Sequence, residues 1–255
     1  MRFCCLGSGS EGNGLLVEAD GTRVLLDCGF GIRDTVARLA RLGVAPESIE
    51  AIIVTHEHND HIGGVAVFAA RYNTPVWLTF GTLSAVAERF AGLPRVRGFD
   101  SHDSFAIGGV EVRPFAVPHD AREPVQFVCS DGRWRLGVVT DLGVSTQHVE
   151  TNLSGCDALV LECNHDIDML AGGDYPLSLK QRIAGKFGHL DNVAAAGLLS
   201  RLDNSRLKHL FAAHLSRQNN RPELARAALA GALGCAPEWI GIADQDDGFG
   251  WREFN

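Results

Sequence analysis

Residues 51–61, Ala51-Ile52-Ile53-Val54-Thr55-His56-Glu57-His58-Asn59-Asp60-His61, join a short apolar run to a cluster of histidines and an aspartate. The run Ala51–Val54 is typical of a strand that is covered on both faces. His56 and His58 can lie on one side of the loop that follows, and Asp60 and His61 come on the next turn. Imidazole and carboxylate ligands suit Zn, Mn or Fe. The segment therefore predicts a metal site at the end of a buried strand.

One such cluster cannot complete the coordination of two metal ions, so further ligands are expected elsewhere in the chain. His119 follows Val117-Pro118 at a predicted strand end, and Asp141 ends the apolar run 136–140. His214 follows the apolar run 210–213 in the same way. Catalytic groups gather at the tips of such strands in layered α/β folds. These three residues are therefore candidate ligands of the same site.

The composition is that of an ordinary globular protein of 255 residues, with a net charge of −8. The longest uncharged run, 72–87, is interrupted by Asn73, Pro75 and Gly81, so no membrane span is expected. No signal peptide is expected either, because a strand is predicted at residues 2–6. Seven cysteines without a CxxC pair indicate reduced thiols and a cytoplasmic location. The acidic charge disfavours a protein that coats nucleic acid, which usually has a basic patch.

Strands and helices alternate without a linker or a repeat, which predicts a layered α/β protein with a single domain. The pairs Asp20-Gly21 and Asp131-Gly132 each predict a hairpin between two apolar runs. Helices are expected at 62–71, 82–91, 191–202 and 221–233, and strands include 158–161, 210–213 and 239–243.

The cluster His56-x-His58-x-Asp60-His61 resembles the HxHxDH motif of the metallo-β-lactamase superfamily, and the resemblance spans nearly the whole chain. It implies a four-layer αββα sandwich over residues 1–255, with two divalent metal ions at one edge. In that family His56, His58 and His119 would hold one ion, Asp60, His61 and His214 the other, and Asp141 would bridge them. Asp27, in the segment Leu25–Gly29, would orient the ligands.

Four segments separate the subfamilies: Leu6–Asn13, Glu162–Asp166, Gly188–Asn192 and Ala213–Asn220. Together they resemble the YycJ group (also called WalJ or VicX), bacterial cytoplasmic proteins regarded as exonucleases on DNA. Asp191 stands where that group usually has serine, and an aspartate can still cap a helix.

Other branches of the superfamily fit less well. A secreted β-lactamase normally has an export signal, and the relevant subclass has cysteine at the place of Asp141. The 72 residues between Asp141 and His214 leave no room for the inserted domain of β-CASP nucleases. The interval from His119 to Asp141 lacks the RNA-gripping arm of the arm-bearing tRNase Z enzymes.

The resemblance implies a metal-dependent phosphodiesterase, an exonuclease that acts on DNA rather than RNA through a hydroxide activated by two metal ions. Asp60 would orient the attacking hydroxide, and His189 would protonate the leaving oxygen. The metals would be Zn²⁺ or Mn²⁺, with Fe as a third candidate, and they would bring the net charge to about −4. The predicted substrate contacts are Asn13, Asn164, His165, Ser216 and Asn219.

Two other functions stay open at this point. One is a thioester or lactone hydrolase of the glyoxalase II type, which shares the ligands but has no use for His189. The other is a non-catalytic, metal-binding regulator linked to a signalling pathway, although a pure scaffold has no need of seven ligands. The sequence leaves the oligomeric state open.

Overall fold

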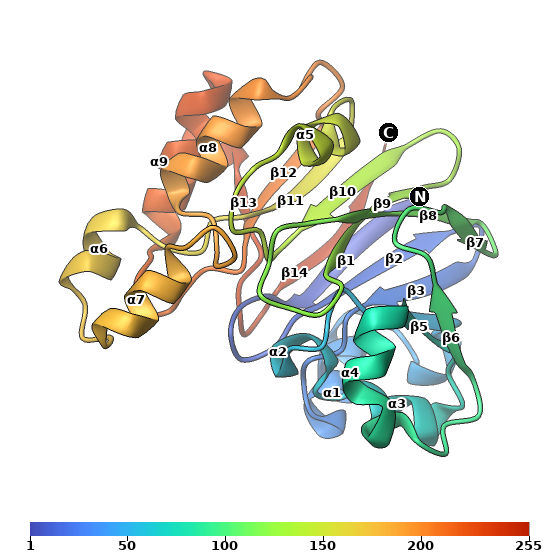
Figure 1. Cartoon of the computed structure of the whole chain (residues 1–255). Coiled ribbons are helices and arrows are strands. Elements are labelled where there is room, and N and C mark those ends of the chain that lie inside the picture. The colour runs from blue at the N-terminus through green and yellow to red at the C-terminus, as the bar shows by residue number, and fades with distance from the viewer. Residues whose placement is uncertain (255) are drawn as a thin grey trace.

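The strands of the chain form two mixed sheets of seven strands each that lie face to face (Figure 1). The computed structural model describes residues 1–254. The first sheet contains, in spatial order, β14 (Phe249–Glu253), β1 (Arg2–Gly7), β2 (Gly14–Ala19), β3 (Thr22–Leu26), β4 (Ala51–Ile53), β5 (Val76–Thr79) and β6 (Val96–Phe99). The second contains β13 (Gly241–Ile242), β12 (His209–Ala213), β11 (Ala158–Glu162), β10 (Arg135–Val139), β9 (Val125–Ser130), β8 (Val110–Ala116) and β7 (Phe105–Ile107).

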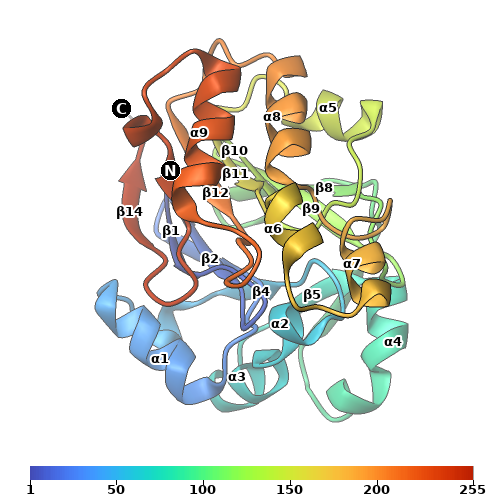
Figure 2. The ribbon, with the colours of Figure 1, turned by 90° about the vertical axis from the view of Figure 1, so that its left-hand side faces the viewer.

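Helices cover the outer face of each sheet, and Figure 2 shows the four layers nearly end on. The helices outside the first sheet are α1 (Ile32–Arg41), α3 (Val65–Tyr72) and α4 (Phe80–Phe90). Those outside the second are α5 (Gln147–Leu153), α8 (Asn192–Arg201) and α9 (Pro222–Leu233). Three short helices lie at the edge that faces the viewer of Figure 2: α2 (Asn59–Ile62), α6 (Ile167–Gly172) and α7 (Leu177–Ile183). Two 3₁₀ turns span Pro46–Ser48 and Pro237–Trp239. This arrangement confirms the predicted αββα sandwich.

Alternating side chains of the strands pack on opposite faces of each sheet. Ile53 belongs to the apolar core between the two sheets. Ile52 and Val54 belong instead to the core between the first sheet and its helices. Both faces of β4 are therefore buried, which explains why its sequence is an unbroken apolar run.

The helix predicted at 62–71 is wrong in its extent, because α2 ends at Ile62 and α3 begins at Val65. Gly63 and Gly64 separate the two helices. A Cβ atom on Gly64 would lie 2.0 Å from the carbonyl oxygen of Phe30. The close approach of the Phe30 loop therefore requires glycine at this break, and an unbroken helix would not fit.

Other local predictions hold with small corrections. The Asp20-Gly21 and Asp131-Gly132 pairs lie in antiparallel hairpins. Asp191 caps α8 by accepting a hydrogen bond from the Ala194 amide. The strand predicted at 239–243 is shorter, since only Gly241–Ile242 pairs with β12. All seven cysteines are free thiols and six are buried, while the cytoplasmic location stays a prediction. Among the described residues, no helix combines the length and the apolar character needed to cross a membrane.

The parallel strands of both sheets deliver their carboxyl ends to one edge of the sandwich. β3, β4 and β5 are parallel neighbours in the first sheet. β10, β11 and β12 are parallel neighbours in the second. The loops that leave these ends carry the histidine cluster, Asp141 and His214, so the topology brings the two halves of the predicted site together.

Gly29 lies against the loop that carries the histidine cluster, and this contact permits a test of the packing. A Cβ atom on Gly29 would lie 1.8 Å from the carbonyl oxygen of Asp60. We expect Gly29→Ala to lower the free energy of unfolding by about 3 kcal/mol, because backbone must move to admit the methyl group. Urea denaturation measures this change. In the control Gly231→Ala, on α9, the new Cβ meets nothing within 4 Å. That variant should lose no stability, and an equal loss in both variants would contradict the packing argument.

Candidate metal centre

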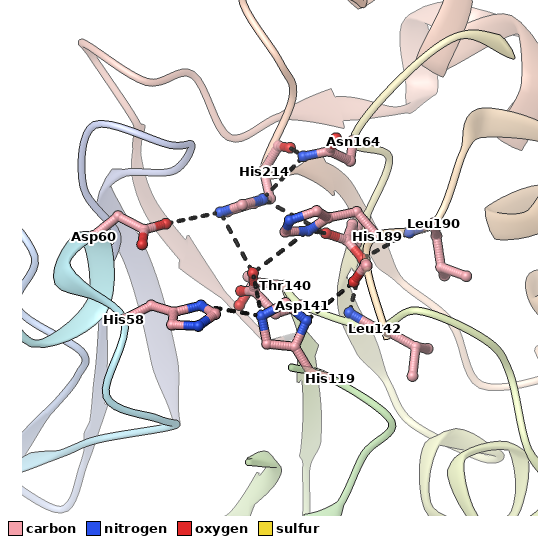
Figure 3. A network of polar contacts seen from close by, with 12 residues as sticks. His58, Asp60, His119, Thr140, Asp141, Leu142, Asn164, His189, Leu190 and His214 are labelled. Atoms are coloured by element: carbon pink, nitrogen blue, oxygen red, sulfur yellow. Dashed lines mark hydrogen bonds and ion pairs between the residues drawn. The ribbon is translucent and has the colours of Figure 1, made fainter. Parts of the chain in front are cut away.

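The seven residues predicted as metal ligands converge at the edge where the parallel strands end. Figure 3 shows His58, Asp60, His119, Asp141 and His214 of this set. Most of them are buried, and only His58 and Asp60 are partly exposed. They come from the loop after β4 and from the ends of three strands of the second sheet. These residues are His56, His58, Asp60, His61, His119, Asp141 and His214.

The nitrogen and oxygen atoms that could bind metal form groups, and these groups correspond to the predicted assignment of three residues to each of two ions. His56, His58 and His119 form one group in which all these atoms lie within 4.8 Å of one another. A second group of the same kind contains Asp60, His61 and His214. Asp141 belongs to two further groups, one with His56 and His61 and one that contains His214. Its carboxylate therefore lies between the two triads.

The spacing and chemistry of these atoms fit bound metal ions. The distance from His119 Nε2 to His58 Nδ1 is 3.2 Å, and that from His214 Nε2 to Asp60 Oδ2 is 3.3 Å. Ligands about 2.1 Å from a tetrahedral zinc ion are separated by about 3.4 Å. His56 Nε2 and Asp141 Oδ2 are buried and form no hydrogen bond. A buried polar atom without a hydrogen bond is costly, and a metal ion would give each of these atoms a partner.

Hydrogen bonds from the surrounding chain orient the histidine rings. His61 Nδ1 lies 2.8 Å from a carboxylate oxygen of Asp27, and the other oxygen of that carboxylate accepts the Thr55 amide. His119 Nδ1 lies 3.0 Å from the Gly188 carbonyl oxygen. A bond at Nδ1 leaves Nε2 of each ring directed toward the cluster, as in other histidine-rich metal sites. Asp27 thus contacts a candidate ligand at the atom from which it can orient the ring.

The charges of the cluster alter the pKa values of its members. Burial lowers the pKa of His56 well below the ordinary histidine value. Burial also disfavours the charged forms of His61 and His214, but Asp141 and the other nearby carboxylates outweigh it. They raise the pKa of His61 well above its usual range and that of His214 to about 10. These carboxylates therefore create a strong local preference for positive charge, which a divalent ion would satisfy.

His189 lies beside the cluster and has a buried partner. Its Nδ1 is 2.8 Å from Glu162 Oε1 and 3.5 Å from Asp141 Oδ1. The other Glu162 oxygen accepts the backbone amides of Leu142 and Leu190. Burial lowers the pKa of His189, but the Glu162 carboxylate reverses this effect and the net pKa is raised. Glu162 therefore fixes the orientation of the ring and stabilises its protonated form.

Glu162 is a member of the site that the sequence does not predict, although its position in the chain offers a signal. Like Asp141 and His214, Glu162 ends an apolar run at the carboxyl end of a parallel strand. It is fully buried, and a carboxylate in that position needs partners. Its partners, His189 and the two backbone amides, lie in segments that the local pattern does not connect with it.

The five predicted substrate contacts fall into two sets. Asn164 and Ser216 line a pocket of about 380 Å³ above the cluster. Asn13, His165 and Asn219 are buried and are not among the residues that line it. The Asn13 side chain instead lies between the loop after β1 and the candidate ligands, with its Nδ2 3.3 Å from Asp60 Oδ2 and 3.1 Å from His61 Nε2.

The chain is similar to a known family and to two curated proteins over most of its length. A family model described as Beta-lactamase superfamily domain matches residues 22–210. The exodeoxyribonuclease YycJ of Bacillus anthracis is 35% identical over 235 residues, which cover 91% of this chain and 89% of the relative. The exodeoxyribonuclease WalJ of Streptococcus pneumoniae is 32% identical over 249 residues, which cover 95% of this chain and 91% of the relative.

Solved structures share the fold over the whole chain. The metallo-β-lactamase fold protein YhfI from Bacillus subtilis has a TM-score of 0.78 at 16% identity, over 99% of this chain and 98% of that one. Zn(2+)-bound PqqB from Methylobacterium extorquens has a TM-score of 0.76 at 18% identity, over all of both chains. At such identities these structures establish the fold alone. The family model and the two exodeoxyribonucleases show that the chain belongs to the metallo-β-lactamase superfamily, in the group that includes the YycJ and WalJ proteins.

Proposed function

We propose that the protein is a metal-dependent phosphodiesterase that acts as an exonuclease on DNA. The observation that carries this proposal is the pair of ligand triads that meet at Asp141, with the His189–Glu162 pair beside them. The choice of DNA and of exonuclease action is supported by the two relatives, which are named exodeoxyribonucleases and are similar over nearly their whole lengths.

The donor set suits two divalent ions. His56, His58 and His119 would hold one ion, Asp60, His61 and His214 the other, and Asp141 would contact both. Three or more imidazoles with carboxylates are compatible with Zn²⁺, Mn²⁺ or Fe²⁺. Such ions, when bound, lower the pKa of a coordinated water toward about 7 and offset the charge of a phosphodiester.

The side chains around the ions would direct the reaction. Asp60 Oδ2 lies 3.3 Å from His214 Nε2, and its carboxylate faces the pocket, where it can orient an attacking water. His189 also lines the pocket. Because its Nδ1 is held by Glu162, its Nε2 is free to give a proton to the leaving oxygen. Asn164 and Ser216 are the proposed contacts to the substrate.

A substrate panel on metal-reconstituted protein tests the proposal. The panel contains single- and double-stranded DNA with and without 5′ phosphate, RNA, bis-p-nitrophenyl phosphate and S-lactoylglutathione. We expect hydrolysis of the phosphodiesters, DNA above RNA, and release of single nucleotides from DNA ends. A chelator should abolish all activity, and added Mn²⁺ or Zn²⁺ should restore it. Turnover of the thioester without turnover of any phosphodiester would overturn the proposal in favour of a glyoxalase II type of activity.

A further inference from the structure

One wall of the pocket comes from the segment that contains α7, which precedes α8 along the chain and lies at the edge that faces the viewer of Figure 2. Tyr175, Leu179, Arg182 and Ile183 of this segment line the pocket together with several of the candidate ligands. Among the described lining residues, Arg182 carries the one permanently cationic side chain. The volume of about 380 Å³ is that of a site for a single small ligand. A pocket of this volume can hold one nucleotide unit of a strand.

Arg182 is tied to the rim of the metal cluster by Asp120. Its Nε lies 2.6 Å from Asp120 Oδ2. The other oxygen of that carboxylate lies 3.5 Å from His119 Nε2 and 3.7 Å from His58 Nε2. The Asp120 amide donates to the Phe187 carbonyl oxygen, so the loops on the two sides of the contact are also joined through their backbones.

This contact occupies only part of the guanidinium group. Within residues 1–254 the Arg182 side chain donates through Nε, and its two Nη groups donate to no protein atom. About 59% of the side chain is exposed. An exposed ion pair contributes little to stability. The arrangement instead resembles a prepared anion site, since a carboxylate at Nε holds the guanidinium while the Nη edge stays open for bidentate binding.

We propose that Arg182 binds the phosphate next to the scissile one, and so determines that the enzyme prefers strands to small phosphodiesters. This inference rests on the proposed function. The Asp120 carboxylate lies between the guanidinium and His119 Nε2, which faces the cluster. Arg182 would therefore lie beside a phosphate bound at the cluster and not over it. Successive phosphates of a strand can then lie on the metal ions and on Arg182.

Equilibrium binding tests this role independently of turnover. The full chain is loaded with Mn²⁺ and carries His189→Ala to slow cleavage, and Kd is measured by fluorescence anisotropy with a short single-stranded DNA oligonucleotide. Adding Arg182→Ala should raise Kd about tenfold to a hundredfold, the effect of losing a hydrogen-bonded charge pair. The slope of log Kd against log salt should fall by about 0.7, because one phosphate contact is lost. Arg182→Lys should retain part of the affinity.

The matched control is Lys186→Ala, which removes the same charge from an exposed residue of the same segment and should change Kd less than twofold. With His189 intact, Arg182→Ala should raise KM for DNA by a much larger factor than KM for bis-p-nitrophenyl phosphate, which has no second phosphate. The inference is overturned if Arg182→Ala leaves Kd and its salt slope unchanged, or if it impairs the small substrate equally. A different result would contradict the proposed function itself: the unsubstituted protein hydrolyses bis-p-nitrophenyl phosphate but neither binds nor cleaves DNA. In that case the role proposed for Arg182 is also wrong, because it requires a DNA substrate.

Discussion

Asp141→Asn is expected to reduce phosphodiester hydrolysis by about a thousandfold, because a metal pair contributes several kcal/mol of transition-state stabilisation. Asp141 is buried between the two ligand triads, and its Oδ2 lies 3.0 Å from His61 Nε2 without accepting a hydrogen bond. Asparagine has the same shape but no charge. The variant should therefore bind at most one ion tightly, because the group between the triads loses the negative charge that attracts divalent ions.

Metal content measured by mass spectrometry, together with kcat on bis-p-nitrophenyl phosphate, checks this expectation. The control is Asp168→Asn, which removes the same charge from an exposed position of α6. That variant should keep both ions and full activity. If Asp141→Asn retained two ions and normal turnover, Asp141 could not be the residue that the two ions share.

His189→Ala is expected to lower kcat on DNA by about 10²–10⁴-fold while the metal content is unchanged, the range observed for loss of general acid–base catalysis. The reason is the position of the ring, which is held by Glu162 at Nδ1 and lines the pocket. A DNA leaving oxygen needs a proton, whereas p-nitrophenolate leaves readily without one. The loss on bis-p-nitrophenyl phosphate should therefore be far smaller than the loss on DNA.

The measurement is a comparison of kcat for the two substrates, with metal content determined on the same samples. The matched histidine control is His102→Ala, which changes an exposed residue in the loop between β6 and β7. This variant should behave like the unsubstituted protein. The effect of His189 should appear in kcat, and that of Arg182 in KM and Kd. An unchanged kcat on DNA with intact metal content would remove His189 from the mechanism.

Much of the fold was predictable because the determining features are local. The apolar runs at β4, β10 and β12 are short and bounded, and burial on both faces of the sheets explains their composition. The Asp-Gly pairs mark hairpins through their backbone preference. The helix boundary at Gly63–Gly64 was missed, because the reason for it is the backbone of Phe30, more than thirty residues away.

The candidate ligands could also be identified from local features. Each is a histidine or an aspartate, and each follows an apolar run that forms a strand. Their partners could not be identified in this way. Glu162 meets His189 27 residues later, and Arg182 meets Asp120 62 residues earlier. Asn13, a predicted substrate contact, lies against Asp60 of the ligand segment, 47 residues later in the chain. The sequence by itself determined which groups the strand ends present. Only the stacking of the two sheets decided which groups meet, because contacts between distant segments depend on the packing of whole layers and leave no local pattern.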